Sequence, residues 1–177
     1  MEQSFVREII EACRKGDRSA QKKLYDSIAP KMFAVCIRYM GDRVAAEDIL
    51  QEGFITLFSK IDSYSGEGAF EGWARKIFVN TALMSLRKTD ALKLSDELET
   101  AWHLKSDAVN QIQNIGYKEL MKLIMGLPDG YRTVFNMFVV EGYSHKEIAN
   151  ALDISEATSR SQLQRARMML QEKIKNL

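Results

Sequence analysis

Residues 142–170, GYSHKEIANALDISEATSRSQLQRARMML, decide the fold of this chain. Ser144 stands three residues before Glu147, which is the spacing of a capping box, so a helix is predicted to begin at His145. Ser155 is a favourable N-cap residue for a second helix. Two short helices joined by a tight turn are typical of a helix-turn-helix, in which the second helix enters the major groove of DNA.

Each of the two predicted helices has an apolar face and a polar face. The apolar positions recur at helical spacing and comprise Ile148, Ala149 and Leu152 in the first helix, and Leu163, Ala166, Leu170 and Ile174 in the second. The polar face of the second helix carries Arg160, Ser161, Gln164 and Arg165. Arginine can bind a guanine edge, glutamine an adenine edge and serine a phosphate, so this face is a candidate DNA reader. A solvated helix packed on its neighbour is the alternative.

Composition bounds the class of protein. The chain has 177 residues, 46% of them hydrophobic, with only two prolines and ten glycines, which favours one or two small all-helical domains. We expect no membrane span and no signal peptide, because no apolar run reaches 18 residues and the N-terminus lacks the signal pattern. Cys13 and Cys36 are isolated, as buried thiols of a reducing cytoplasm would be. The net charge of +1 means that only local patches can indicate a nucleic-acid partner.

Helical periodicity divides the chain into segments. Helices are predicted over residues 4–15, 19–40, 44–61, 69–88, 114–125 and 128–140, ahead of the helix-turn-helix. Polar residues dominate between the fourth and fifth helices, where the pattern weakens. The predicted fold is therefore all-α: two small helical domains joined by a flexible linker, with the helix-turn-helix in the second. The boundaries are 1–90 for the first domain, 91–113 for the linker and 114–177 for the second domain.

The helix over residues 44–61 has an acidic, amide-bearing patch. Its predicted core stripe comprises Ala46, Leu50, Phe54, Leu57 and Ile61. The patch comprises Asp48, Gln51 and Glu52, spaced i, i+3 and i+4. Taken alone, such a patch is equally well explained as a solvated face.

The helix over residues 69–88 is basic where the preceding one is acidic. We expect its apolar face to comprise Phe70, Trp73, Ile77 and Met84, with Trp73 packed in the core rather than serving as a stacking platform for a base. A second face carries Lys76, Asn80 and Arg87, and Arg75 and Lys88 add positive charge. An acidic helix followed by a basic, amide-bearing helix indicates two different partners.

The order of these motifs resembles the sigma-70 family of bacterial sigma factors, and within it the short extracytoplasmic-function group, which keeps only regions 2 and 4. The motifs are AEDILQEGF at residues 46–54, then Phe70, Trp73, Ile77 and Asn80, then Leu127-Pro128, then the helix-turn-helix ending Arg165-Ala166-Arg167. The likeness extends from about Ser19 to Lys173. It implies a non-enzymatic subunit without cofactors that binds core RNA polymerase, directs it to promoters and helps to melt DNA.

The resemblance also implies roles for particular residues. Those of the polymerase-binding helix are Asp48, Gln51, Glu52 and Phe54, of which we expect Phe54 to be mainly core. Those at the melted −10 element are Tyr64, Arg75, Lys76, Asn80 and Arg87, since an unstacked base needs a pocket and positive charge near a single strand. Those at the duplex −35 element are Ser155, Arg160, Ser161, Gln164 and Arg165. An anti-sigma factor is a common partner in the group, and the sequence leaves its presence open.

Two residues depart from the family pattern. Ser159 stands where the family usually has an aliphatic residue, which predicts a looser recognition helix or a shifted register. Gln162 stands where a basic residue is common, which predicts fewer phosphate contacts.

The predicted linker is long enough for both promoter elements. At about 3.3 Å per residue, residues 91–113 reach at most ~76 Å. Two DNA readers about one and a half turns apart need roughly 50 Å. The main alternative function is a helix-turn-helix repressor or activator that is not a polymerase subunit, and a protein-binding helical adaptor is another. Enzymatic activity is disfavoured because His103 and His145 are isolated and no phosphate-binding loop or HExxH motif occurs.

Overall fold

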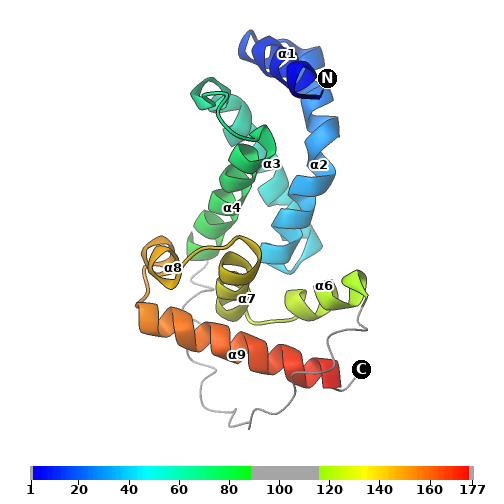
Figure 1. Cartoon of the computed structure of the whole chain (residues 1–177). Helices are drawn as coiled ribbons and strands as arrows, with labels where there is room; N and C mark the ends of the chain where they lie inside the picture. The colour runs from blue at the N-terminus through cyan, green and yellow to red at the C-terminus, as the bar shows by residue number, and fades with distance from the viewer. Residues whose placement is uncertain (1, 89–115, 176–177) are drawn as a thin grey trace. The chain divides into compact units, whose positions relative to one another are not determined.

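The computed structural model describes residues 2–88 and 116–175 (Figure 1). Within these ranges every regular element is helical and no strand occurs, so the all-α prediction is confirmed. The linker predicted at 91–113 lies outside the described residues. The chain divides into two compact units, one of Met1–Ile37 with Arg43–Ala82 and the other of Arg38–Asp42 with Leu83–Leu177.

The first unit is a cluster of helices around an aliphatic and aromatic core. Its elements are α1 (Glu2–Arg14), α2 (Arg18–Met40, whose last turn belongs to the second unit), α3 (Arg43–Ser59), the 3₁₀ turn η1 (Ile61–Ser63) and α4 (Phe70–Lys88, up to Ala82). Helices α3 and α4 approach closely at Gly53, where an added Cβ would lie 2.3 Å from Cδ1 of Phe78. A glycine at this position lets the Phe78 ring pack directly on the backbone of α3.

The predicted apolar face of α4 is confirmed in part, since Phe70 is buried and Trp73 packs against the rings of Phe70 and Tyr64. Met84 is 59% exposed, and Trp73 and Ile77 are only partly buried. The buried side chains of α4 are Phe70, Ala74, Phe78, Val79, Ala82, Leu83 and Leu86. Apolar residues occur on more than one side of this helix, so spacing alone did not identify the buried side. Two of the buried positions are alanines, Ala74 and Ala82, which the prediction did not include.

The core stripe of α3 was predicted more accurately. Four of its five predicted residues are buried, namely Ala46, Phe54, Leu57 and Ile61. The exception is Leu50, which is only partly buried, while the adjacent Ile49 is buried. The stripe is therefore offset by one residue at this point, because a position three residues after Ala46 lies on the same helix face as one four residues after it.

The second unit is built along its last helix. Its elements are α6 (Tyr117–Met125), α7 (Asp129–Phe135), the π-helical turn η4 (Asn136–Val140), α8 (His145–Leu152) and α9 (Glu156–Lys175). In Figure 1, α9 runs beside α7, with α8 near its N-terminal end. One core cluster comprises Ile124, Leu127, Tyr131, Ala166 and Leu170.

The segment predicted as one helix over residues 128–140 changes its winding. After Phe135 the backbone hydrogen bonds change to the π-helical pattern, in which each amide donates to the carbonyl five residues before it. The amide of Glu141 thus donates to the carbonyl of Asn136 at 3.0 Å. Such turns frequently occur at functional positions in α-helices.

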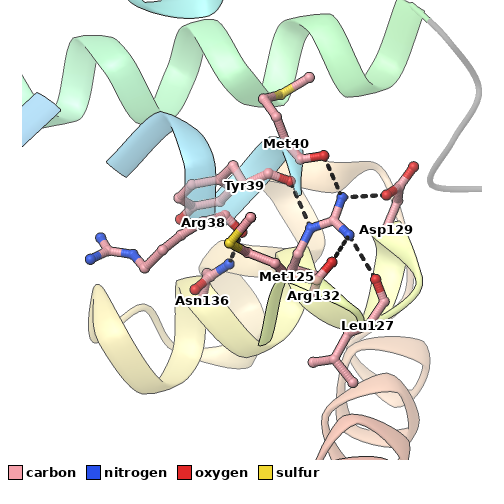
Figure 2. Close-up of polar contacts among 8 residues, drawn as sticks. All are labelled: Arg38, Tyr39, Met40, Met125, Leu127, Asp129, Arg132 and Asn136. Carbon is pink, nitrogen blue, oxygen red and sulfur yellow. Dashed lines mark hydrogen bonds and ion pairs between the residues drawn. The ribbon is translucent and has the colours of Figure 1, made fainter. Parts of the chain in front are cut away.

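A buried arginine connects several carbonyl groups inside the second unit (Figure 2). Arg132 is 3% exposed and its Nε donates to the carbonyl of Tyr39 at 2.9 Å. Its two terminal nitrogens donate to the carbonyls of Met40, Met125 and Leu127 at 3.0, 3.1 and 2.7 Å, and to the carboxylate of Asp129. The last carbonyls of a helix have no partner within it, so Arg132 satisfies the end of α2.

Two further side chains complete this polar cluster. Nδ2 of Asn136 donates to the carbonyl of Arg38 at 2.8 Å (Figure 2), so three consecutive α2 carbonyls are bonded by α7 and η4. Arg38 also forms an ion pair with Glu141 at 3.2 Å. Gly41 follows with a φ of +70°, a left-handed helix ending for which glycine is favoured. A Cβ there would also come within 2.7 Å of Arg132 Nη1.

Candidate functional site

The helix-turn-helix forms as its local signals predict. Helix α8 begins at His145, the amide of Ser144 donates to the Glu147 carboxylate at 2.8 Å, and the amide of Glu147 donates to Ser144 Oγ at 3.3 Å. The backbone hydrogen bond from Ser144, with a second from its hydroxyl, lowers the pKa of Glu147. The chain then turns through Asp153, which has a φ of 57°.

The polar face of α9 is open to solvent where the sequence predicted it. We define the α9 face as Arg160, Ser161 and Gln164, all of which are exposed, while Leu163, Ala166 and Leu170 are buried on the opposite side. Arg160 forms a 2.7 Å ion pair with the Glu156 carboxylate, one turn earlier. This arginine is thus already extended along the helix surface.

The other two predicted −35 residues lie partly off this face. Ser155 is exposed and acts as the N-cap, its Oγ accepting from the Thr158 amide at 2.9 Å. Arg165 is partly buried, and its Nη1 donates to the Tyr131 hydroxyl at 3.3 Å. The set of residues predicted to read the −35 element did not include Arg167. This residue is exposed, and its guanidinium lies 6.0 Å from the centre of the Phe138 ring. Its i+7 spacing from Arg160 was the signal that could have identified it.

The two residues that depart from the family pattern are both buried. Ser159 is fully buried, and its hydroxyl forms a 2.9 Å hydrogen bond with Nδ1 of His145. Gln162 is 3% exposed, so this position is not available to a DNA phosphate. The structure therefore shows a polar contact between α8 and α9 at the position where a looser helix was expected.

The acidic patch on α3 is exposed and has apolar neighbours. Asp48, Gln51 and Glu52 are all open to solvent. Val44 and Ile55, at 68% and 71% exposure, lie on the same side by helical spacing. We call these five residues the α3 surface. Exposed aliphatic side chains beside charge are typical of protein contacts, and the sequence analysis missed both of them.

The remaining residue predicted to bind polymerase, Phe54, is 4% exposed and packs against the rings of Tyr25 and Phe78, with centroids 4.5 and 5.1 Å away. It supports α3 from inside, in keeping with the mainly structural role expected for it. Phe54 itself offers little area for a partner.

The basic residues of α4 share an exposed side. We define the α4 face as Lys76, Asn80 and Arg87, all of which are open to solvent. Arg75 is partly buried. These groups offer positive charge and one amide to a ligand.

Tyr64 was expected at the melted strand, but the structure places its ring inside the first unit. It is 7% exposed, packs against Phe70 and Trp73 at 5.2 and 5.4 Å between ring centres, and donates its hydroxyl to the carbonyl of Gly68 at 2.8 Å. In this conformation Tyr64 orders the loop that precedes α4. The exposed atoms of the loop come from its other residues.

Comparison with known families agrees with this geometry. The model for sigma-70 region 2 matches residues 24–91, and the model for sigma-70 region 4 matches residues 117–170. A helical unit with an exposed acidic helix, followed by a helix-turn-helix unit, is thus the arrangement of an RNA polymerase sigma factor. The chain belongs to the sigma-70 family and, within it, to the extracytoplasmic-function group.

Similar proteins match over their full length. The chain is 27% identical to the ECF RNA polymerase sigma factor SigW of Bacillus subtilis (strain 168) over 98% of both chains. It is 29% identical to the ECF RNA polymerase sigma-E factor of Haemophilus influenzae, covering 99% of this chain and 98% of that protein. The fold is shared with the sigma factor RpoE from Bartonella quintana, solved with the anti-sigma factor NepR, at a TM-score of 0.52, 23% identity and coverage of 87% and 96%.

Family membership decides between the functions that the sequence left open. The protein binds core RNA polymerase and directs it to promoter DNA to start transcription, so the independent repressor or activator is set aside. No helix within the described ranges has the length and apolar character needed to cross a membrane.

Proposed function

We propose that this sigma factor divides its work among three surfaces. The α3 surface binds core polymerase, the α4 face holds the melted −10 strand, and the α9 face reads the duplex −35 element. Residues 1–90 then act as region 2 and residues 114–177 as region 4, joined through 91–113. The subunit contributes no catalytic group and acts in the cytoplasm beside the polymerase. The observation that carries the proposal is the exposed polar face of α9 on a complete helix-turn-helix.

The chemistry of the α3 surface suits a protein partner. Carboxylates of Asp48 and Glu52 steer a basic surface toward it, and the exposed side chains of Val44 and Ile55 supply apolar area that is lost to water on binding. DNA would be repelled by the same two carboxylates.

The chemistry of the α4 face suits a single strand. Lys76 and Arg87 neutralise phosphates without reading sequence, whereas the Asn80 amide can both donate to and accept from a base edge. An amide reaches the Watson–Crick edge only after the base leaves its partner, so its contribution is made in melted DNA.

The chemistry of the α9 face suits the major groove. Arg160 and Gln164 lie one turn apart on the exposed side of a helix whose other side is buried in the unit core. To bind a base, Arg160 must exchange its ion pair with Glu156 for a contact with DNA. This exchange favours sites that offer a guanine, because a bidentate arginine–guanine contact contributes about 1–3 kcal/mol of discrimination.

Transcription from two kinds of template tests this division. We expect Asn80→Ala to lower run-off transcription from a duplex promoter, and a pre-melted bubble at −10 to restore most of it, because the cost of unpairing is already met. Arg160→Ala and Arg165→Ala should each relax the preference at one −35 position and should not be fully rescued by the bubble. Lys76→Ala should lower affinity for all sequences alike and give a shallower salt dependence.

Arg43→Ala is the matched control, since Arg43 is also exposed and paired with a glutamate one turn away. Its transcription should equal that of the native protein on both templates. Permanganate footprinting of exposed thymines reports melting directly. If the bubble rescues the Arg160 and Arg165 variants but not the Asn80 variant, the assigned division of labour is reversed.

A further inference from the structure

One side chain at the start of α8 touches two other elements. The His145 ring stacks on the Phe138 ring of the π turn η4, with centroids 4.5 Å apart and planes inclined by 24°. Its Nδ1 forms a 2.9 Å hydrogen bond with Ser159 Oγ of α9. The π turn, the first helix and the second helix of the helix-turn-helix therefore meet at His145.

We propose that His145 and Ser159 form a positioning pair that fixes the rotation of α9 against α8 and so determines which base pairs the α9 face can read. This inference rests on the proposed −35 role of α9. It assigns a function to an isolated histidine and to a serine that stands where the family usually has an aliphatic residue.

The burial of Ser159 gives the pair its directional effect. The Ser159 hydroxyl is fully buried, and buried polar groups are costly unless they are paired. An apolar contact would tolerate small rotations, because the hydrophobic effect has no direction. A hydrogen bond requires a narrow range of distance and angle, so only a narrow range of rotations of α9 keeps the bond between Ser159 and His145.

That rotation also determines the direction of the DNA-reading side chains. Arg160 and Ser161 directly follow Ser159 and are exposed, and each residue of an α-helix is turned by about 100° from the previous one. Any rotation that moved Ser159 away from His145 would turn Arg160 by the same angle. Base recognition depends on such angles because bidentate contacts need both hydrogen bonds aligned.

The two contacts of His145, its stacking on Phe138 and its hydrogen bond to Ser159, can be removed separately. His145→Phe keeps an aromatic ring to stack on Phe138 and removes the hydrogen bond to Ser159. His145→Asn keeps a polar atom near the position of Nδ1 and removes the ring. Ser159→Ala removes the hydroxyl from the other side. Lys146→Ala, at the next and exposed position of α8, is the control.

The experiment uses the full chain with core polymerase on a promoter library randomised at the −35 element. Sequencing of the transcribed templates gives the preference at each position, and thermal melting of the free protein gives its stability. We expect His145→Phe and Ser159→Ala each to reduce the preference at the Arg160-contacted position by roughly tenfold. The double variant should be no worse than either single variant, and His145→Asn should retain most of the preference.

The outcomes separate this inference from the function on which it rests. A native protein that shows no −35 preference contradicts the −35 role itself. A native protein with a clear preference, which both single variants keep while only their melting temperature falls, overturns the positioning pair. Additive losses in the double variant also overturn it, because independent residues add whereas a bonded pair is lost once.

Discussion

Arg132 shows how one residue can organise the interior of a unit. Its guanidinium carries five N–H donors in a rigid fork, and these donate to four carbonyls and one carboxylate. Lysine could not reproduce this geometry, because its single ammonium cannot reach carbonyls on several sides. The arginine is thus specified by the number and direction of its acceptors as much as by charge.

Replacement of Arg132 should destabilise the protein. We expect Arg132→Ala to lower the free energy of unfolding by about 2–4 kcal/mol, because several buried carbonyls lose a charged donor. Urea unfolding followed by circular dichroism measures the change. Arg160→Ala removes an exposed, paired arginine and should alter stability by less than about 0.5 kcal/mol. Equal midpoints for the two variants would contradict the assigned role of Arg132.

His145 should make stability depend on pH. Burial lowers the pKa of His145, Arg160 and Arg167 lower it further, and Glu156 opposes them, while η4 carries no charged side chain. Because the folded pKa lies below the ordinary 6.5, the unfolded chain takes up the proton first, and stability falls as the pH drops below about 6.5. Thermal melting between pH 7.5 and 5.5 should show a smaller decrease for His145→Phe. Parallel curves would exclude this origin.

At the scale of single elements, α3 is a helix with separate structural and binding sides. Phe54 and Leu57 hold it in the core, whereas Asp48 and Glu52 contribute no packing. Mutations on the exposed side can therefore be interpreted in terms of binding.

Charge reversal on α3 should abolish polymerase binding without unfolding the protein. We expect Asp48→Lys with Glu52→Lys to prevent copurification with core polymerase, because both carboxylates lie in the α3 surface, and to leave the circular dichroism spectrum unchanged. Asp26→Lys with Glu71→Lys makes the same change in charge on exposed residues of α2 and α4 and should bind normally. Normal binding by the folded Asp48/Glu52 variant would remove the α3 surface as the docking site.

Local signals predicted the elements well. The Ser144–Glu147 box marked the start of α8, since a capping box acts within one helical turn. The π turn at Asn136–Val140 was missed, because apolar periodicity over so few residues does not distinguish a π turn from an α-helix.

Contacts between distant residues could not be predicted. The Arg132 bonds to Tyr39 and Met40 join positions more than 90 residues apart, and the His145–Ser159 bond crosses between two helices. The burial of Tyr64 and the exposure of Met84 likewise follow from how the helices pack, which spacing within one helix does not determine. The candidate surfaces were therefore predicted as helix faces, whereas the residues that orient them were not.

At the scale of the whole molecule, each proposed DNA-binding face is small. The α4 face has two cations and the α9 face one, and Arg160 is paired with Glu156 in the free protein. Tight promoter binding therefore needs more contacts than either face supplies.

The free protein should bind promoter DNA weakly. We expect dissociation constants of about 10⁻⁴ to 10⁻⁶ M at physiological salt, as is typical of non-specific contact by a small basic patch. Fluorescence anisotropy with a labelled duplex measures this, and addition of core polymerase should give tight, sequence-specific binding. Nanomolar, sequence-specific binding by the free chain would mean that it recognises promoters without polymerase.

The bond between Arg132 and the end of α2 also bears on how the protein is made. The Met40 carbonyl leaves the ribosome 92 residues ahead of its partner. At about 5–20 residues per second, that interval lasts roughly 5 to 20 seconds. Throughout it the finished α2 ends in carbonyls that only water can satisfy. A nascent chain arrested before Arg132 thus keeps the end of α2 bonded to water, and residues 38–42 cannot yet join the second unit, to which they belong in the folded protein.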